Sequence, residues 1–250
     1  NLMDELGAPV AGLTGGAADY QAIVRIPKPA LPTPVPADIS ITSELSGLEF
    51  LLPEPLKKPH EEVYPLALQI EFPEDRQMVA NGSLGDDLRF SNQFVKDDDG
   101  WDFDRGALVL GGVAPSLPES RGLHISGQTP LLYVSDWLAL AKSAQGDGPR
   151  FTDRLRSVDI AIDDLHLFGQ HLVDHRITVD RSGAEWLVQA DGESVVGTAT
   201  IPYDLTGLRP ITLDMQKLLL PGGDDEHERR EDVASVDPRS LPGVAIRADE

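Results

Sequence analysis

Three histidines and an aspartate lie close together in the sequence, and side chains of these types bind metal ions. His171 and His175 are four residues apart, with His166 and Asp174 nearby. On a helix this spacing would bring two imidazoles to one face, where they could share a zinc ion. On a strand the same two side chains would lie about 13 Å apart, too far to bind one ion. Because the adjoining segment 176–179 reads as a strand, we expect histidines with structural or solvated roles.

The acidic turn Asp97-Asp98-Asp99-Gly100 resembles part of a calcium loop, but its surroundings do not fit one. A calcium loop aligned on Gly100 needs an oxygen ligand at position 95 and a bidentate glutamate at position 106. These positions hold Val95 and Gly106, so we interpret the segment as a hairpin turn. The sequence also contains no Gly-x-Ser-x-Gly elbow, P-loop, Gly-x-Gly-x-x-Gly fingerprint or cysteine. We therefore expect no catalytic residue, no metal ligand and no cofactor, in a protein that is not an enzyme.

The charge balance excludes several classes of partner. The chain has 250 residues, with 21 basic and 42 acidic side chains and a formal net charge of −21. This charge repels nucleic acid and anionic bilayer surfaces. No run approaches the ~18 apolar residues of a membrane-spanning helix, so we expect membrane contact only through regions outside this sequence. The chain begins without methionine and ends in mid-pattern, and we expect it to be part of a longer protein.

Alternation of apolar and polar residues with a period of two dominates the chain, and this pattern predicts β-strands. Turn residues separate the alternating segments, which is typical of hairpins. The clearest strands are expected at 88–95, 101–104, 108–110, 158–162, 177–179 and 186–188. Antiparallel strands with a single helix disfavour a doubly wound α/β fold. The predicted fold is therefore mostly β, an antiparallel meander with one short helix.

One helix and two irregular segments interrupt the strands. The helix is predicted over 135–145, with Ser135 as its N-cap and an apolar side that begins at Trp137. Closely spaced prolines predict an extended connector over 26–37, and the polar run 222–232 predicts a solvated loop. We divide the chain into a strand with a Pro-rich connector (1–36), a main antiparallel β module (37–221), and an acidic loop with the start of a further strand (222–250).

Several short strings follow one another along most of the chain, from residue 43 to about 246. They are Ser43-Glu44-Leu45-Ser46-Gly47-Leu48, Leu52-Pro53-Glu54-Pro55-Leu56-Lys57-Lys58, Tyr64-Pro65-Leu66, 105–112, 122–127, Asp136-Trp137, 158–159 with 165–169, 183–187 with 197–199, and 237–243. Their order and spacing resemble the YhdP proteins, which are large AsmA-like envelope proteins of Gram-negative bacteria. The resemblance implies an open β groove shaped as a half-pipe, in the periplasmic part of a protein anchored in the inner membrane by a helix outside this sequence.

Members of this family are implicated in moving phospholipid between the two membranes, and the family offers no catalytic residues to transfer. The implied partners are phospholipid and other envelope proteins. If the apolar strand face lines a lipid path, Asp159 and Asp163 should face water while alternate residues contact acyl chains. The residues expected to contact lipid are Leu108, Leu110, Ile125, Val158, Ile160, Ile162, Ile177, Val179, Trp186 and Val188.

Two other functions fit the same sequence pattern. A closed β-sandwich, acting as a scaffold or a carbohydrate-binding module, would bury the same apolar face as its core. Alternation cannot separate this alternative from the groove, because both need apolar residues at alternate positions. An acidic glycoside hydrolase would need two carboxylates at a catalytic separation, which composition alone does not establish.

Overall fold

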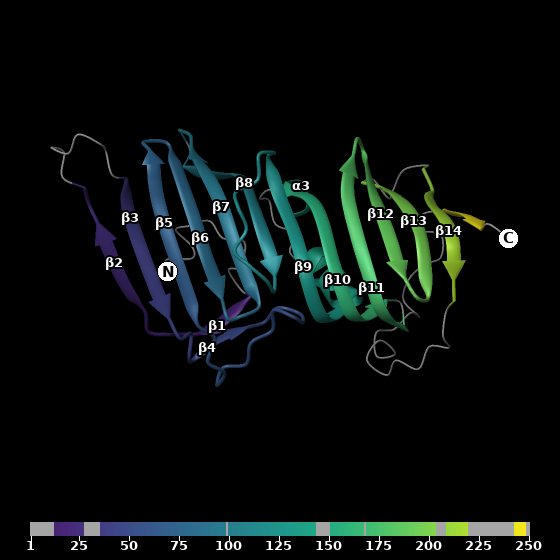
Figure 1. The fold of residues 1–250 in the computed structure, drawn as a ribbon, viewed down its shortest axis with the longest axis horizontal. Coiled ribbons are helices and arrows are strands. Elements are labelled where there is room, and N and C mark those ends of the chain that lie inside the picture. The colour runs from purple at the N-terminus through teal and green to yellow at the C-terminus, as the bar shows by residue number, and fades with distance from the viewer. Residues whose placement is uncertain are drawn as a thin grey trace. The chain divides into compact units, whose positions relative to one another are not determined.

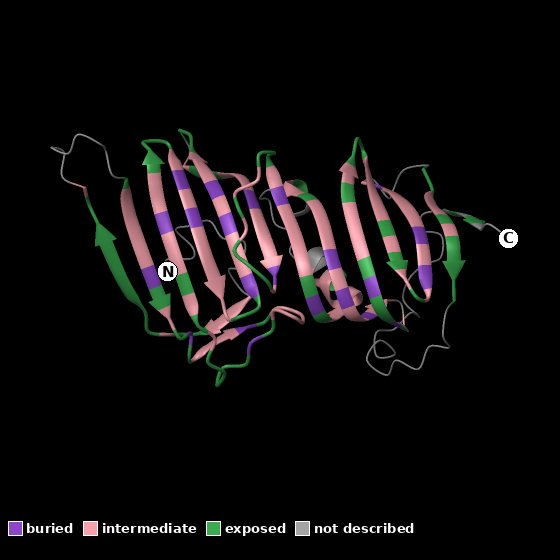
Figure 2. Cartoon of the chain, viewed as in Figure 1, coloured by how far each residue is buried: buried purple, intermediate pink, exposed green. Residues whose placement is uncertain are grey.

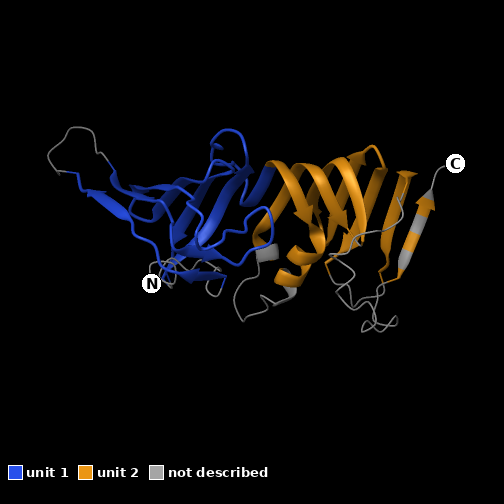
Figure 3. Ribbon diagram, turned by 90° about the horizontal axis from the view of Figure 1, so that it is seen from below, with its two compact units in different colours: residues 1–126 blue, residues 127–250 orange. Residues whose placement is uncertain are grey.

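Strands dominate the described part of the chain. The structure is a computed structural model that describes residues 13–27, 36–98, 100–143, 151–167, 169–203, 209–219 and 243–248. The chain divides into two compact units, Asn1–Ser126 and Gly127–Glu250 (Figure 3). The strands form an open sheet that does not close into a barrel, which confirms the predicted fold class.

Unit 1 is built on a meander of antiparallel strands (Figure 1). In the order of pairing these are β2 (Gln21–Arg25), β3 (Ala37–Ser43), β5 (Leu66–Glu74), β6 (Gln77–Leu84), β7 (Leu88–Lys96) and β8 (Trp101–Leu110). The backbone N–H of Asp97 donates to the carbonyl of Gly100 over 2.8 Å between β7 and β8. This contact and the β7–β8 pairing confirm the predicted hairpin turn.

A separate two-stranded sheet in unit 1 pairs β1 (Thr14–Gly16) with β4 (Leu48–Phe50). Lys58 joins it through a single bridge to Phe50 and is only 1% exposed. Its Nζ donates to the carbonyls of Leu48 and Pro59, at 2.6 and 3.0 Å. A buried ammonium is costly unless its donors are satisfied, so these two bonds hold the segment after β4 in place.

Unit 2 continues with longer hairpins. β9 (Gly122–Tyr133) begins before the boundary between the units, and β10 (Leu155–Leu167), β11 (Gln170–Ser182), β12 (Glu185–Gly192), β13 (Val195–Pro202) and β14 (Ile211–Leu218) follow. From β10 to β14 each strand is antiparallel to the next. β15 (Val244–Ala248) instead pairs with β14 in parallel. The predicted meander was antiparallel throughout, so this last pair differs from the prediction. The connection 219–243 permits this, because a parallel pair needs a crossover of about a dozen residues or more.

Two helices lie between β9 and β10: α2 (Val134–Ser143) and α3 (Phe151–Arg154). α2 begins one residue before the predicted N-cap, a difference typical of helix ends. It contacts β10, with Trp137 half-buried and Leu138 45% exposed, as the predicted apolar side requires. The four residues of α3 are too few to show a helical period in the sequence.

Buried residues are scattered along the strands as single positions (Figure 2). Unit 1 has a small core of Ile70, Met78 and Ala80, against which Ile39, Leu68, Phe72 and Phe94 pack. In unit 2 Thr129 on β9 is 1% exposed, and four more deeply buried side chains lie toward one end of β10 and β11: Ile162, Leu165, Leu172 and His175. Most of the predicted connector, the acidic loop 222–232 and the end of the predicted helix lie outside the described residues, and the three-part division stays a prediction.

Candidate functional site

Strand register brings apolar side chains of unit 1 into rows that cross its sheet. One row consists of four leucines, Leu66, Leu84, Leu88 and Leu110, each the Cα partner of the next. The adjacent row on the same side is Ile41, Leu68, Gly82, Phe90 and Leu108. We call this side the apolar face of unit 1. Two of the predicted lipid contacts, Leu108 and Leu110, lie on it.

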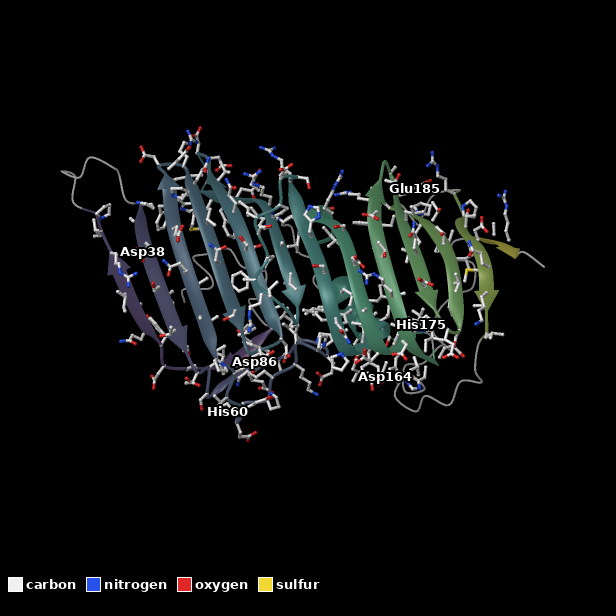
Figure 4. The ribbon with its side chains drawn as sticks, in the orientation of Figure 1. Asp38, His60, Asp86, Asp164, His175 and Glu185 are labelled. Atoms are coloured by element: carbon white, nitrogen blue, oxygen red, sulfur yellow. The ribbon has the colours of Figure 1, made fainter. Side chains whose placement is uncertain are left out.

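The opposite face of unit 1 carries hydrogen-bonded polar side chains. Arg25 pairs with Asp38 at 2.8 Å, and the amide of Gln69 donates to the same carboxylate at 3.3 Å. Ser40 donates to Gln69 at 2.8 Å. Figure 4 labels Asp38 on β3 within this network. The sheet of unit 1 is therefore amphipathic.

The same separation of faces extends over five strands in unit 2. One row, with one residue from each of β10 to β14, is Val158, Val179, Val188, Ala199 and Leu213. A second row on the same side is Ile160, Ile177, Ala190, Gly197 and Met215. Ile162 follows Ile160 by alternation and Trp186 precedes Val188, so all seven predicted contacts of unit 2 lie on one side. We call it the apolar face of unit 2.

A polar row lies on the other face, displaced by a single residue. It is Asp159, Thr178, Gln189, Thr198, Asp214 and Arg247, with one residue from each of β10 to β15. Arg176 donates to both oxygens of Asp159 at 2.7 Å, which raises the pKa of Arg176. Asp163 accepts a hydrogen bond of 3.1 Å from Gln128 on β9.

The predicted contacts differ in how far they are exposed. Leu110 and Ile160 are 8% exposed and Ile162 is 2% exposed, so these three are buried. The other seven are half-buried: Leu108, Ile125, Val158, Ile177, Val179, Trp186 and Val188. In the described part of the chain, the second sheet consists of β1 and β4 alone, and α2 contacts β10. The described residues thus provide no second large sheet to cover either apolar face.

The described histidines of unit 2, which are His166, His171 and His175, contact protein groups and do not converge on one point. His175 is 2% exposed; its Nδ1 lies 2.9 Å from the carbonyl of Val173, and its Nε2 accepts from the N–H of Val195 at 3.1 Å. An added Cβ at Gly192 would overlap the His175 ring, so glycine is needed there. Protein bonds at both nitrogens make His175 a structural residue that joins β11 to the β12–β13 hairpin.

His171 and His166 form a separate stack at the same end of β10 and β11. Their ring centroids are 4.8 Å apart, and His171 Nε2 lies 2.7 Å from Asp164. His166 also contacts the ring of Tyr133 at 4.4 Å. Figure 4 shows Asp164 and His175 toward one end of these strands and Glu185 toward the other. No group of three or more potential metal ligands occurs among the described residues.

Sequence reasoning missed a cluster around Arg181 at the Glu185 end of the apolar face of unit 2. Arg181 is the cross-strand partner of Trp186, and its guanidinium lies 5.6 Å from that ring and 4.8 Å from the ring of Tyr203. Its Nε donates to the Tyr203 hydroxyl at 2.9 Å and Nη1 donates to the carbonyl of Asp153 at 2.8 Å. Arg181 lies between the strands predicted at 177–179 and 186–188, and no local signal indicated its partners 22 and 28 residues away.

Comparison with known proteins gives one match. A family model described as YhdP protein matches residues 1–250. Neither a curated protein nor a solved structure matches the chain significantly. Among the described residues, no helix combines the length and apolar character needed to cross a bilayer.

Proposed function

Because the chain belongs to the YhdP family of AsmA-like envelope proteins, we propose that it is a periplasmic segment of a groove that conducts phospholipid between the inner and outer membranes. The apolar faces of units 1 and 2 hold the acyl chains, and the segment performs no catalysis. Its partners are phospholipid and other envelope proteins, and other parts of the protein make the membrane contacts.

The observation that carries the proposal is the five-strand row from Val158 to Leu213. Five strands have four spacings of ~4.8 Å, so the row is about 19 Å long. This exceeds the ~15 Å that one leaflet contributes to the hydrocarbon core of a bilayer. The row is therefore long enough to accommodate an acyl chain lying across the strands. The neighbouring polar row keeps the reverse side of the same strands in water.

The open sheets count against the closed β-sandwich. A sandwich buries its apolar faces between two sheets about 10 Å apart. In the described residues of unit 2, five hairpin-connected strands and β15 belong to one sheet, and the half-buried row at Val179 and Val188 faces no second sheet. The carbohydrate-binding alternative would use an exposed aromatic platform, whereas Trp186 is half-buried against Arg181 and Tyr203.

Site-specific photo-crosslinking in the full-length protein tests this function in cells. A photoreactive residue at Val179 should capture phospholipid, because Val179 is half-buried and belongs to the apolar row that begins at Val158. The same residue at Thr178 is the matched control: it is also half-buried, on the same strand, and belongs to the polar row. A probe at Ile160 should label less than one at Val179, because Ile160 is 8% exposed.

Two results would overturn the proposal. Equal labelling at Val179 and Thr178 would show that the two faces are not distinguished by lipid. Absence of lipid at both positions, together with a lipid-free native mass and binding of a sugar by the purified protein, would favour the carbohydrate-binding alternative.

A further inference from the structure

Arg181 is a cation at one end of the apolar face of unit 2. Strand alternation places it on the same side of β11 as Val179, two residues or about 7 Å further along the strand. Across the strand pair it faces Trp186, which precedes Val188 on the same side of β12. The five-strand apolar row is thus bordered by a guanidinium at its Glu185 end.

The Arg181 guanidinium is fixed in position without a negatively charged partner. Two of its five N–H groups donate to the Tyr203 hydroxyl and the Asp153 carbonyl, and two aromatic rings lie against it. Both acceptors are uncharged. Among the described residues no carboxylate lies within ion-pair distance of Arg181. Three N–H groups therefore remain for an anionic acceptor.

A second arginine lies beside it. Arg156 precedes Val158 by two residues on β10, so alternation places it on the apolar face. Ser157 and Asp180 are the first Cα partners of β10 and β11, and continuing this register by one residue sets Arg156 opposite Arg181. Arg156 is exposed, and within the described ranges it has neither a hydrogen bond nor an ion pair. The two guanidiniums thus border one end of the apolar face together.

The nearby carboxylates do not neutralise this pair. Asp180 and Glu185 alternate with Arg181 and Trp186 and therefore lie on the opposite face. Glu185 is already paired with Arg209 at 3.0 Å. Asp153 contributes its carbonyl, and its side chain is exposed on α3. The chain has 42 acidic and 21 basic side chains, so most cations have carboxylates available as partners. Among the described residues, Arg156 and Arg181 have none, although they lie at the end of an apolar row.

We propose that Arg156 and Arg181 bind the phosphate group of a phospholipid whose acyl chains lie along the apolar row of unit 2. Guanidinium groups bind phosphate oxygens through paired, charge-assisted hydrogen bonds. The apolar row that begins with Val158, Val179 and Val188 lies two residues further along these strands. The acyl chains attached to the phosphate lie on this row. The inference rests on the proposed function and adds an orientation to it, with the headgroup at the Glu185 end of the strands.

Binding of three probes to the purified full-length protein tests the site. The probes are dioctanoyl phosphatidylglycerol, the uncharged dioctanoylglycerol, and inorganic phosphate. The substitutions are Arg156→Gln and Arg181→Gln, with Arg176→Gln as the matched control, since Arg176 is on β11 but faces the other way. Each of the first two should weaken phosphatidylglycerol binding about tenfold, the loss expected for one charge-assisted contact, and leave dioctanoylglycerol binding unchanged. The control should change neither.

The outcomes separate this inference from the proposed function. If both lipids bind the wild type but neither substitution affects phosphatidylglycerol selectively, the phosphate site is wrong and the lipid-binding face stands. If neither lipid binds, the proposed function fails as well. Competition by inorganic phosphate alone, without any contribution from the acyl chains, would reassign the site to free phosphate and overturn the headgroup assignment. If Arg181→Gln unfolds through loss of its Tyr203 contact, the exposed Arg156 decides the test.

Discussion

Val188→Asp measures how open the apolar face of unit 2 is. Full burial of a valine side chain stabilises a fold by about 1.5–3 kcal/mol, and Val188 is half-buried, so its removal costs about 1 kcal/mol. On an open face the new carboxylate keeps contact with water, which limits the total loss to about 1–2 kcal/mol. For a chain of this size that loss lowers the melting temperature by about 2–8 °C. In a closed core the carboxylate would lose its hydration and cost several kcal/mol more.

Two further variants calibrate the measurement. Gln189→Asp introduces the same carboxylate one residue along the strand, on the exposed polar row, and should leave the melting temperature nearly unchanged. Ile162→Asp introduces it at a position that is 2% exposed, and should unfold unit 2. Thermal unfolding followed by circular dichroism, combined with lipid capture by a photoreactive residue at Val179, gives both readouts. We expect Val188→Asp to remain folded and to capture little phospholipid.

Either of two results would refute an open, lipid-contacting apolar face in unit 2. Unfolding of Val188→Asp to the same degree as Ile162→Asp would mean that the face is a closed core. A folded Val188→Asp variant that captures as much lipid as the wild type would mean that acyl chains do not pass this row.

Three further predictions concern residues outside the proposed lipid path. His175→Ala should lower the free energy of unfolding by about 3 kcal/mol, because it leaves a cavity and a buried N–H without an acceptor; a change below about 1 kcal/mol in urea denaturation would contradict the structural role. Lys58→Met should cost about 2 kcal/mol in the same assay, because two backbone carbonyls lose their charged donor, and Lys57→Met is its control. Burial, followed by the charge of Asp87, raises the pKa of Tyr64 above 10.0. The neutral phenol is favoured in the folded state, so its stabilisation is complete below pH 10 and is lost as the pH rises through the folded pKa; Tyr64→Phe should remove that part of the alkaline loss of stability, and an unchanged pH profile would count against it.

Alternation in the sequence was sufficient to predict which side of each strand is apolar. The segments 158–162, 177–179 and 186–188 all became strands whose alternate residues share a face. The depth of burial could not be predicted in this way. Val158 and Ile160 occupy equivalent positions in the pattern, yet only Ile160 is buried. The β10 strand also contacts α2, and a local pattern carries no information about where such a helix docks.

Contacts between segments distant in the chain could not be predicted from the sequence either. The Arg181 cluster joins β11 to residues 22 and 28 positions away, and β15 finds β14 after a long connection. Lys58 follows a proline-rich string typical of a surface loop, but the fold buries it completely. In each case the sequence identifies the residue, but the topology of the chain determines which residues it contacts.

The sequential order of β10 to β14 has a consequence for how the chain acquires its structure. From β11 to β13 each strand pairs with the one before it through a two-residue connection such as Gly183-Ala184. Loop closure is therefore inexpensive at these steps, and the contacts form between segments close in sequence, which favours rapid folding. A chain that emerges from its N-terminal end can add one hairpin at a time to an edge that is already complete. β15 is different, because it cannot pair with β14 until the connection 219–243 and β15 itself have emerged. Until then, β14 presents a free edge to any other extended segment.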